Sequence, residues 1–192
     1  MDRNVATQRT DYRGVQMKII AISGKAGAGK DTTATFIKDY ANGIGRKVLI
    51  THYADLLKYI CRTLLGWDGV KDQRGRELLQ VVGTDVVRKQ DPDFWVRFMS
   101  DVLTLFHGQW DTVLIPDTRF PNEIEYLRQH GFDVIHLRII RDGNTRNLTE
   151  SQMHHASETA LDVVAADYII LNDKGLQELK EHAIQVYTEV DV

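Results

Sequence analysis

Short apolar runs alternate with amphipathic segments along most of the chain. Five runs are nearly continuous and rich in β-branched residues, as expected for strands that are buried on both faces; they span residues 18–23, 47–52, 111–117, 133–139 and 167–173. Helical patterns separate them at residues 30–40, 54–65, 75–88, 94–106, 121–130 and 176–187. Because strands alternate with helices, we expect right-handed crossovers and a five-stranded, mostly parallel sheet in a three-layer α/β/α fold.

Two connections are longer than a simple crossover requires. About sixty mostly helical residues separate the second and third strands, and roughly thirty lie between the fourth and fifth. Open parallel sheets bind ligands beyond the carboxyl ends of their strands, so both insertions are predicted to cover a site there. We therefore expect an acceptor-binding insertion at residues 53–107 and a lid at residues 141–158.

The remaining organisation is simple. Residues 1–16 are polar and without pattern, and we expect a flexible tail that adds nothing to the core. Residues 17–192 then form a single domain, a size that suits a chain of 192 residues with 43% apolar and 27% charged residues.

Charge and apolar content limit the classes of partner that the sequence predicts. A formal net charge of −3 gives no overall attraction to nucleic acid or to membranes, and there is neither an apolar run long enough to span a bilayer nor the apolar centre of a signal peptide. The single Cys61 excludes an internal disulfide and suits a reducing compartment. We expect a cytoplasmic protein that binds neither nucleic acid nor a membrane; the sequence leaves a homodimer open.

The stretch GKAGAGK, Gly24 to Lys30, fits the pattern G-x-x-x-x-G-K between a strand and a helix. Its glycines let backbone N–H groups face phosphate oxygens, and its lysine would bridge the terminal phosphates during transfer. The residues predicted to bind ATP are Gly24, Ala26, Gly27, Ala28, Gly29, Lys30, Asp31, Thr32 and Thr33.

Asp31 departs from the usual motif, which has Ser or Thr after the lysine as a magnesium ligand. Its carboxylate is itself a hard ligand, or could hold a metal-bound water, so we expect a different Mg²⁺ shell. Asp117 ends the third predicted strand and is the second candidate for Mg²⁺, although aspartates at strand ends are common. Arg119 follows two residues later and could grip a phosphate with its guanidinium fork.

The acceptor is predicted from the two insertions. The first one supplies cations for a phosphate, polar groups for a base edge and an aromatic ring for stacking, from Asp55, Lys58, Arg74, Arg76, Gln80, Thr84, Asp85, Arg88 and Trp95. Taken singly, most of these charges suit a solvated helix face equally well. The number of arginines favours a phosphate monoester as the acceptor, while Asp55 keeps a hydroxyl acceptor open as its base.

The second insertion is predicted to close over the phosphates. Arg138, Arg141 and Arg146 lie at the exit of the fourth strand, and a lid of arginines would exclude water from the transfer. The neighbouring His154 and His155 lack further ligands at metal-binding spacing, so packing or a place in the lid is favoured over a metal site.

Several motifs in order resemble the phage-type deoxynucleoside monophosphate kinases, a branch of the P-loop nucleotide kinases. They are SGKAGAGKDTTATFI, YADLLK, ELLQVVGTD, DPDFW, IPDTRFPNE and HHASETALD followed by DYIILND, and they run from Met17 almost to the carboxyl terminus. The resemblance implies a P-loop NTPase fold with an acceptor insertion and a lid, and transfer of the γ-phosphoryl group of ATP to a nucleoside monophosphate with Mg²⁺. The sequence is also similar to the phosphomevalonate kinases, which share an aspartate directly after the lysine of the loop.

Carried over residue by residue, the resemblance implies that the loop binds ATP and Mg²⁺ and that Asp117 and Arg119 act at the phosphates. It also implies that His155, Ser157 and Glu158 lie beside the lid and the acceptor. Catalysis is then expected from Lys30, Arg119, Arg138 and Arg141. Two alternatives stay open: a P-loop kinase for another small phosphorylated acceptor or a coenzyme-precursor hydroxyl, and an NTPase switch. The guanine-reading N-K-x-D motif of such switches is absent from the sequence.

Overall fold

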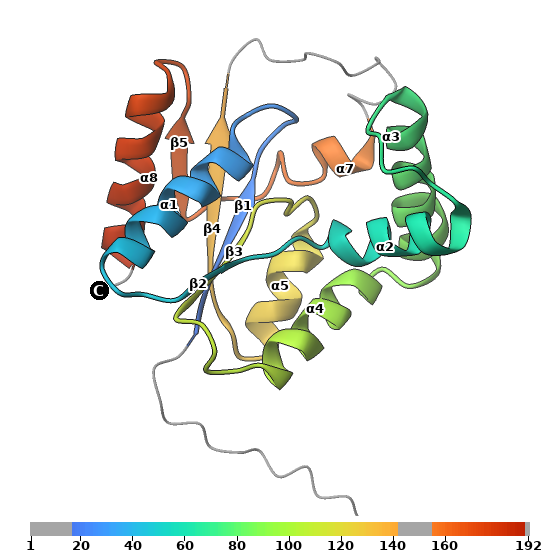
Figure 1. The fold of residues 1–192 in the computed structure, drawn as a ribbon, viewed down its shortest axis with the longest axis horizontal. Helices are drawn as coiled ribbons and strands as arrows, with labels where there is room; N and C mark the ends of the chain where they lie inside the picture. The colour runs from blue at the N-terminus through green and yellow to red at the C-terminus, as the bar shows by residue number, and fades with distance from the viewer. Residues whose placement is uncertain (1–16, 142–154, 191–192) are drawn as a thin grey trace, which may run out of the picture.

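The computed structural model describes residues 17–141 and 155–190. Its centre is a five-stranded sheet in the order β2-β3-β1-β4-β5 (Figure 1). The strands are β1 (Lys18–Ser23), β2 (Val48–Ile50), β3 (Thr112–Ile115), β4 (Asp133–Ile140) and β5 (Tyr168–Leu171). All four pairings are parallel, which confirms the predicted sheet. β2, β3 and β5 are shorter than the apolar runs that predicted them.

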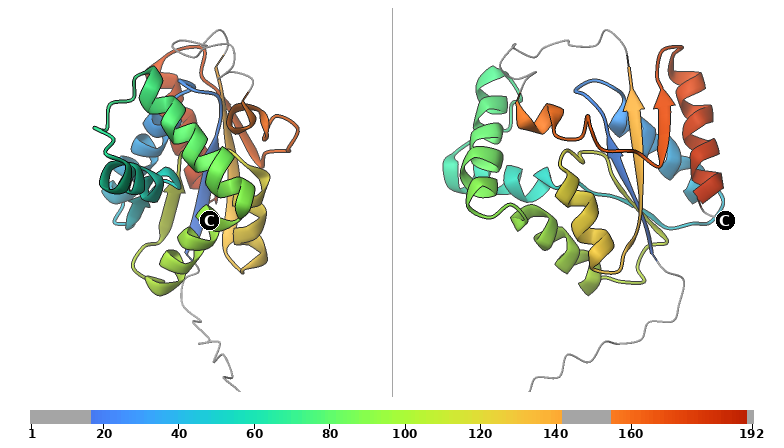
Figure 2. Two further views of the ribbon diagram at one scale, coloured as in Figure 1. Left: turned by 90° about the vertical axis from the view of Figure 1, so that its right-hand side faces the viewer. Right: turned by 180° about the vertical axis from the view of Figure 1, so that it is seen from behind.

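Helices cover both faces of the sheet. One face is covered by α1 (Lys30–Gly43) and α8 (Leu176–Val190), and the other by α4 (Phe94–Leu105) and α5 (Pro121–Gln129); views from opposite sides show the two layers (Figures 1 and 2). Along β1, Ile20 and Ile22 pack with α1 and α8, while Ile19 and Ala21 pack on the opposite core. Side chains alternate between the faces of a strand, so both sets are buried, as the continuous apolar run predicted.

The first insertion folds as α2 (Ala54–Leu65), α3 (Gln73–Gln80) and η1 (Val81–Arg88), followed by α4. The predicted helix at residues 75–88 was wrong in two respects. It begins earlier, because the Asp72 side chain accepts a hydrogen bond from Gly75 N at 2.7 Å and caps α3, and its second half is a π-helix. Within η1, Gly83 packs against α2 so closely that an added Cβ would meet Leu57 Cδ2 at 2.7 Å. Hydrophobic periodicity cannot distinguish the two helix types over eight residues.

Some predictions fall outside the described residues. The tail at residues 1–16 and most of the predicted lid, with Arg146 and His154, belong to this group. The described part of the second insertion includes the short helix α7 (Ala156–Thr159). Within residues 17–141 and 155–190, no helix has the length and apolarity needed to cross a membrane.

Candidate functional site

The predicted phosphate loop connects β1 to α1 at the carboxyl edge of the sheet. Gly24 and Gly29 have φ angles of 145° and 107°, and a Cβ at Gly24 would meet Ile139 O at 2.4 Å, so the turn requires glycine there. The Lys30 ammonium lies inside the loop and donates to Gly24 O at 2.7 Å and to Lys25 O at 3.0 Å. Burial, and next the nearby Arg119 charge, lower the pKa of Lys30 to about 8. The loop thus surrounds one desolvated cation.

Asp31 begins a chain of charged contacts that leads to α2. Its Oδ1 lies 3.0 Å from His52 Nε2, and Asp55 Oδ2 accepts from His52 N at 3.1 Å. Asp55 in turn accepts from Lys58 Nζ at 2.9 Å. The hydrogen bond with Asp31 raises the pKa of His52, and the same bond lowers the pKa of Asp31. His52 was not predicted as a site residue, although it closes the apolar run of the second strand.

This contact makes stability depend on pH. The folded-state pKa of His52 is raised, so the contact contributes fully below its ordinary value of 6.5 and is lost as pH rises through the raised value. The pKa of Asp31 is lowered, so the carboxylate stays charged down to values below its ordinary 3.8. The Asp31 side chain is 80% exposed, and we expect less than about 1 kcal/mol from the pair.

The corresponding prediction compares wild type with His52→Gln by urea unfolding at about pH 5.5 and about pH 8.5. Wild type should lose more unfolding free energy than the variant as pH rises. His182→Gln on α8 serves as the control, because His182 lies outside this chain of contacts. Equal pH dependence in wild type and His52→Gln would show that the contact does not form in solution.

Asp117 links the end of β3 to the first insertion. Its two carboxylate oxygens accept from Tyr53 N and Ala54 N, each at 3.0 Å. These N–H groups lie at the start of α2, where a carboxylate also complements the helix dipole. Both oxygens are therefore engaged with the backbone, and a Mg²⁺ role for Asp117 stays a prediction.

Arg119 is held by α7. Its Nη1 donates to Ser157 O at 2.9 Å and forms an ion pair with the Glu158 carboxylate. The other oxygen of that carboxylate accepts from Ala26 N of the phosphate loop at 3.1 Å. Glu158 thus occupies one loop N–H and one arginine, two kinds of group that bind phosphate elsewhere. Lys25 reinforces the contact by donating to Glu158 O and to the carboxylate of Asp162.

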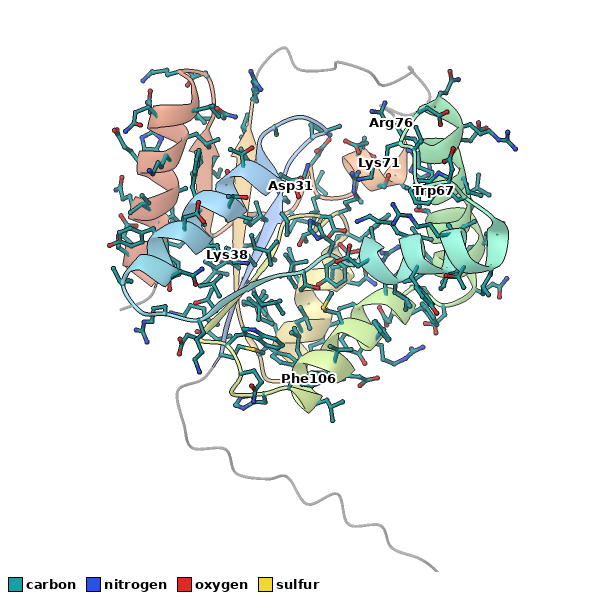
Figure 3. All side chains as sticks on the ribbon, viewed as in Figure 1. Asp31, Lys38, Trp67, Lys71, Arg76 and Phe106 are labelled. Carbon is teal, nitrogen blue, oxygen red and sulfur yellow. The ribbon has the colours of Figure 1, made fainter. Side chains whose placement is uncertain are left out.

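A cavity of about 500 Å³, the larger cavity, extends from the loop into the first insertion. It brings together many predicted site residues: Ala26, Gly27, Lys30, Asp31, Lys58, Arg76, Gln80, Thr84, Arg88, Trp95, Asp117, Arg119, Ser157 and Glu158. Figure 3 shows Asp31 at the start of α1 facing Lys71 and Arg76 across the opening. Trp95 reaches this cavity but is only 4% exposed, since its ring packs in the core and its indole N–H donates to Gly83 O at 2.9 Å.

Other lining residues were missed by the sequence reasoning. They are His52, Tyr53, Ala54, Leu57, Lys71, Leu79, Pro116, Phe120 and Glu123. Phe120 and Glu123 lie within the quoted stretch IPDTRFPNE, so the motif marked the segment without indicating which of its side chains face the cavity.

A cavity of about 260 Å³, the smaller cavity, lies against the other side of the loop. Gly27, Gly29, Lys30, Asp31 and Thr32 form one wall; Arg141, Asn172, Leu176 and Leu179 form the rest. Arg141 Nη1 lies 3.5 Å from Gly27 O, and Asn172 Nδ2 donates to Ala28 O at 2.8 Å. Asn172, Leu176 and Leu179 had not been predicted; the polar residue directly after a buried strand was the available signal.

Eight predicted site residues line neither cavity: Gly24, Ala28, Thr33, Asp55, Arg74, Asp85, Arg138 and His155. Arg138 instead donates to Leu161 O and Val164 O, each at 2.6 Å, and so fixes the turn after α7. His155 caps α7 by accepting from Ser157 N at 3.2 Å. Their predicted roles at the phosphates or acceptor have no counterpart in these contacts.

The residues of the site fit a magnesium ion that the phosphates of a bound nucleotide would hold together with one protein carboxylate. Mg²⁺ commonly takes one or two protein carboxylates and completes its shell with water and substrate phosphates. Asp31 offers such an exposed carboxylate beside the loop, with one oxygen bonded to His52. Among the described residues, no three His, Cys, Asp or Glu side chains converge on a common point.

These features define a class of protein: a parallel sheet whose phosphate loop lies between two cavities is the fold of the P-loop kinases. An APS kinase of Mycobacterium tuberculosis, in complex with AMPPNP and APS, superimposes with a TM-score of 0.55 at 14% identity, covering 92% of this chain and 99% of that one. A thymidylate kinase of Ehrlichia chaffeensis superimposes with a TM-score of 0.53 at 14% identity, covering 89% and 98%.

The chain belongs to the deoxynucleotide monophosphate kinase family, whose model matches residues 67–183. The deoxynucleotide monophosphate kinase of Enterobacteria phage T4 is 36% identical over 115 residues, which are 58% of this chain and 45% of that protein. Its counterpart from Escherichia phage RB69 is 36% identical over 106 residues, 54% and 41% of the two chains. The match spans less than half the length of either relative. It confirms the family that the motifs resemble.

Proposed function

We propose that this protein is a Mg²⁺-dependent kinase that transfers the γ-phosphoryl group of ATP to a deoxynucleoside monophosphate. One observation carries the proposal: two cavities adjoin the phosphate loop on different sides and share Gly27, Lys30 and Asp31. Donor and acceptor phosphates would thus meet at one buried cation, which is the arrangement that in-line transfer needs. Membership of the deoxynucleotide monophosphate kinase family supports the same reaction.

The smaller cavity suits the donor. Backbone N–H groups of the loop and the start of α1 favour a polyphosphate there, and Leu176 and Leu179 provide apolar surface beyond it. Arg141 lies on the same side and adds a cation. Asp31 would hold Mg²⁺, which when bound neutralises phosphate charge.

The larger cavity suits a monophosphate acceptor. It carries Lys58, Lys71, Arg76, Arg88 and Arg119, enough positive charge for a phosphate monoester that is already ionised near neutral pH. Asp55, the candidate base for a hydroxyl acceptor, does not line the cavity and is bonded to His52 and Lys58. The charges therefore favour a monophosphate over a hydroxyl.

In this mechanism the chain positions groups and neutralises charge. Lys30 moves from the loop carbonyls Gly24 O and Lys25 O to the transferring phosphoryl group, and Arg119 balances charge from the acceptor side. The residues 53–107 act as the acceptor insertion and residues 141–158 as the lid that excludes water. A cytoplasmic location and the lack of a nucleic-acid partner remain predictions from the sequence, which leaves a homodimer open.

The direct test is incubation with ATP and Mg²⁺ and a panel of deoxynucleoside monophosphates, ribonucleoside monophosphates and other phosphomonoesters, followed by separation of the products. We expect the diphosphate of at least one deoxynucleoside monophosphate. Phosphorylation of another phosphomonoester alone would favour the alternative kinase, and ADP release without an acceptor product would favour an NTPase switch.

Glu158 provides a prediction about nucleotide binding. Because its carboxylate occupies Ala26 N and Arg119, binding of phosphate at these groups has to displace it. Glu158→Gln removes the charge and should tighten binding of the deoxynucleoside monophosphate about three- to tenfold, measured by calorimetry without ATP. Glu189→Gln, near the carboxyl end of α8 and in the lining of neither cavity, should leave binding unchanged. Weaker binding of the monophosphate in Glu158→Gln would instead make Glu158 a group that helps to bind the acceptor.

A further inference from the structure

The end of η1 places one arginine in a tightly specified position. The guanidinium of Arg88 lies over the Phe120 ring, 3.9 Å from its centroid, and both residues line the larger cavity. Arg88 Nη2 donates to Glu123 Oε1 at 2.6 Å, while Nη1 donates to Pro92 O at 3.2 Å and to Asn122 Oδ1 at 3.3 Å. The plane and the rotation of this guanidinium are thereby both fixed.

Glu123 connects this arginine to the segment that carries Arg119. Its side chain is 2% exposed, and its second oxygen accepts from Arg119 N at 2.7 Å and from Phe120 N at 3.0 Å. Burial raises the pKa of Glu123, while the Arg88 charge and the two N–H groups oppose that rise. A single carboxylate thus holds the side chain of one cavity arginine and the backbone of the other.

Stability alone explains this arrangement poorly. Buried ion pairs seldom stabilise a fold more than well-packed apolar residues of similar volume. In addition, the Nε of Arg88 is buried and has no hydrogen-bond partner among the described residues, a defect that folded proteins rarely tolerate without a use. The pair also lines the larger cavity and is absent from the lining of the smaller one.

We propose that Glu123 is a positioning residue for the acceptor monophosphate. It holds Arg88 flat on Phe120, so that the two side chains form a rigid wall against the acceptor nucleotide, and it ties this wall to Arg119 at the phosphates. This inference rests on the proposed function and deepens its acceptor side. Because Glu123 acts through Arg88 and through the Arg119 backbone, its loss should affect acceptor binding and leave donor binding intact.

The test is Glu123→Gln, which keeps the shape of the side chain. Its amide oxygen can still accept from the two backbone N–H groups, but then its NH₂ group faces Arg88 and the pair is broken. We expect the KM for the deoxynucleoside monophosphate to rise about tenfold and the KM for ATP to change less than about twofold. Asp91→Asn, which breaks the exposed Arg97–Asp91 pair before α4, is the control and should change neither KM.

A second variant covers the case in which Glu123→Gln does not fold. Arg88→Met combined with Glu123→Gln removes both charges and leaves no buried charge unpaired. Its acceptor KM should show the same rise of about tenfold, because the two residues act as one unit.

The outcomes are distinct. A wild-type acceptor KM in the folded variants, an equal rise in the KM for ATP, or failure of both variants to fold would overturn the positioning role. If the wild-type protein phosphorylates no nucleoside monophosphate, the proposed function fails together with this inference. If the wild-type protein is active and the acceptor KM of Glu123→Gln is unchanged, the positioning role is wrong and the proposed function stands.

Discussion

Lys30→Ala is expected to lower turnover by about a thousandfold while the chain remains folded. The ammonium is the one cation that both cavities share among their described lining residues, since Arg119 lines only the larger one and Arg141 only the smaller one. Without it, charge that develops on the transferring phosphoryl group loses its central partner. The measurement is the steady-state rate of diphosphate formation, together with circular dichroism to verify folding.

Lys38→Ala is the matched control for this experiment. Lys38 lies on the same helix, farther along α1 from the opening, and lines neither cavity (Figure 3). Its removal should leave turnover within about twofold of wild type, as is usual for surface changes that affect no site. Near-normal turnover in Lys30→Ala would exclude the phosphate loop as the centre of transfer, and with it the proposed reaction.

Arg119→Met is expected to lower turnover by about a thousandfold or more, the scale seen when an arginine that stabilises a transferring phosphoryl group is lost. Methionine keeps much of the side-chain volume and removes the charge and the donors. The guanidinium lies in the larger cavity beside Ser157 and Glu158, so it can reach an acceptor phosphate once Glu158 is displaced. Single-turnover rates at saturating ATP and acceptor measure the effect on the chemical step.

Two further variants sharpen the Arg119 experiment. Arg119→Lys retains a charge but loses the planar fork, and should restore only part of the rate. Arg97→Met on α4 removes an exposed arginine that lines neither cavity, and should leave turnover unchanged. A rate for Arg119→Met close to that of Arg97→Met would limit Arg119 to holding α7 against the loop.

The sheet and the phosphate loop could be predicted from the sequence because their physical causes are local. Strands buried on both faces must be apolar throughout, and a backbone that turns around a phosphate must have glycine where φ is positive. The residue type at Gly24 and Gly29 is therefore enough to predict their positive φ angles. The same reasoning held for the alternation of strands and helices, which required the parallel order.

The contacts between distant segments could not be read in this way. Asp117 looks like a metal ligand in the sequence, yet its partners are two N–H groups located more than sixty positions earlier. Glu123 looks like an ordinary first-turn helix residue, and its meeting with Arg88 depends on how η1 packs beside α5. Such pairings arise only when the insertion is folded over the sheet.

The residues of the first insertion that line the larger cavity follow helical spacing, which selects one face of a helix. Arg76, Gln80, Thr84 and Arg88 are spaced by four residues, and all of them line the larger cavity. Arg74 and Asp85 fall off this face, and neither lines it. A count of charged residues could not separate the two groups, whereas their spacing along the helices does.

The π-helical geometry of η1 determines the direction in which the side chains at its end point. An α-helix completes a turn in 3.6 residues, so a four-residue repeat gradually drifts around it, whereas the wider π turns of Val81–Arg88 oppose the drift and keep Arg88 aligned with Arg76. α-Helical turns over the same residues would let this drift accumulate and would turn Arg88 away from the face that carries Arg76. The direction of the Arg88 side chain thus depends on the type of helical turn in η1, even when every residue that lines the larger cavity is retained.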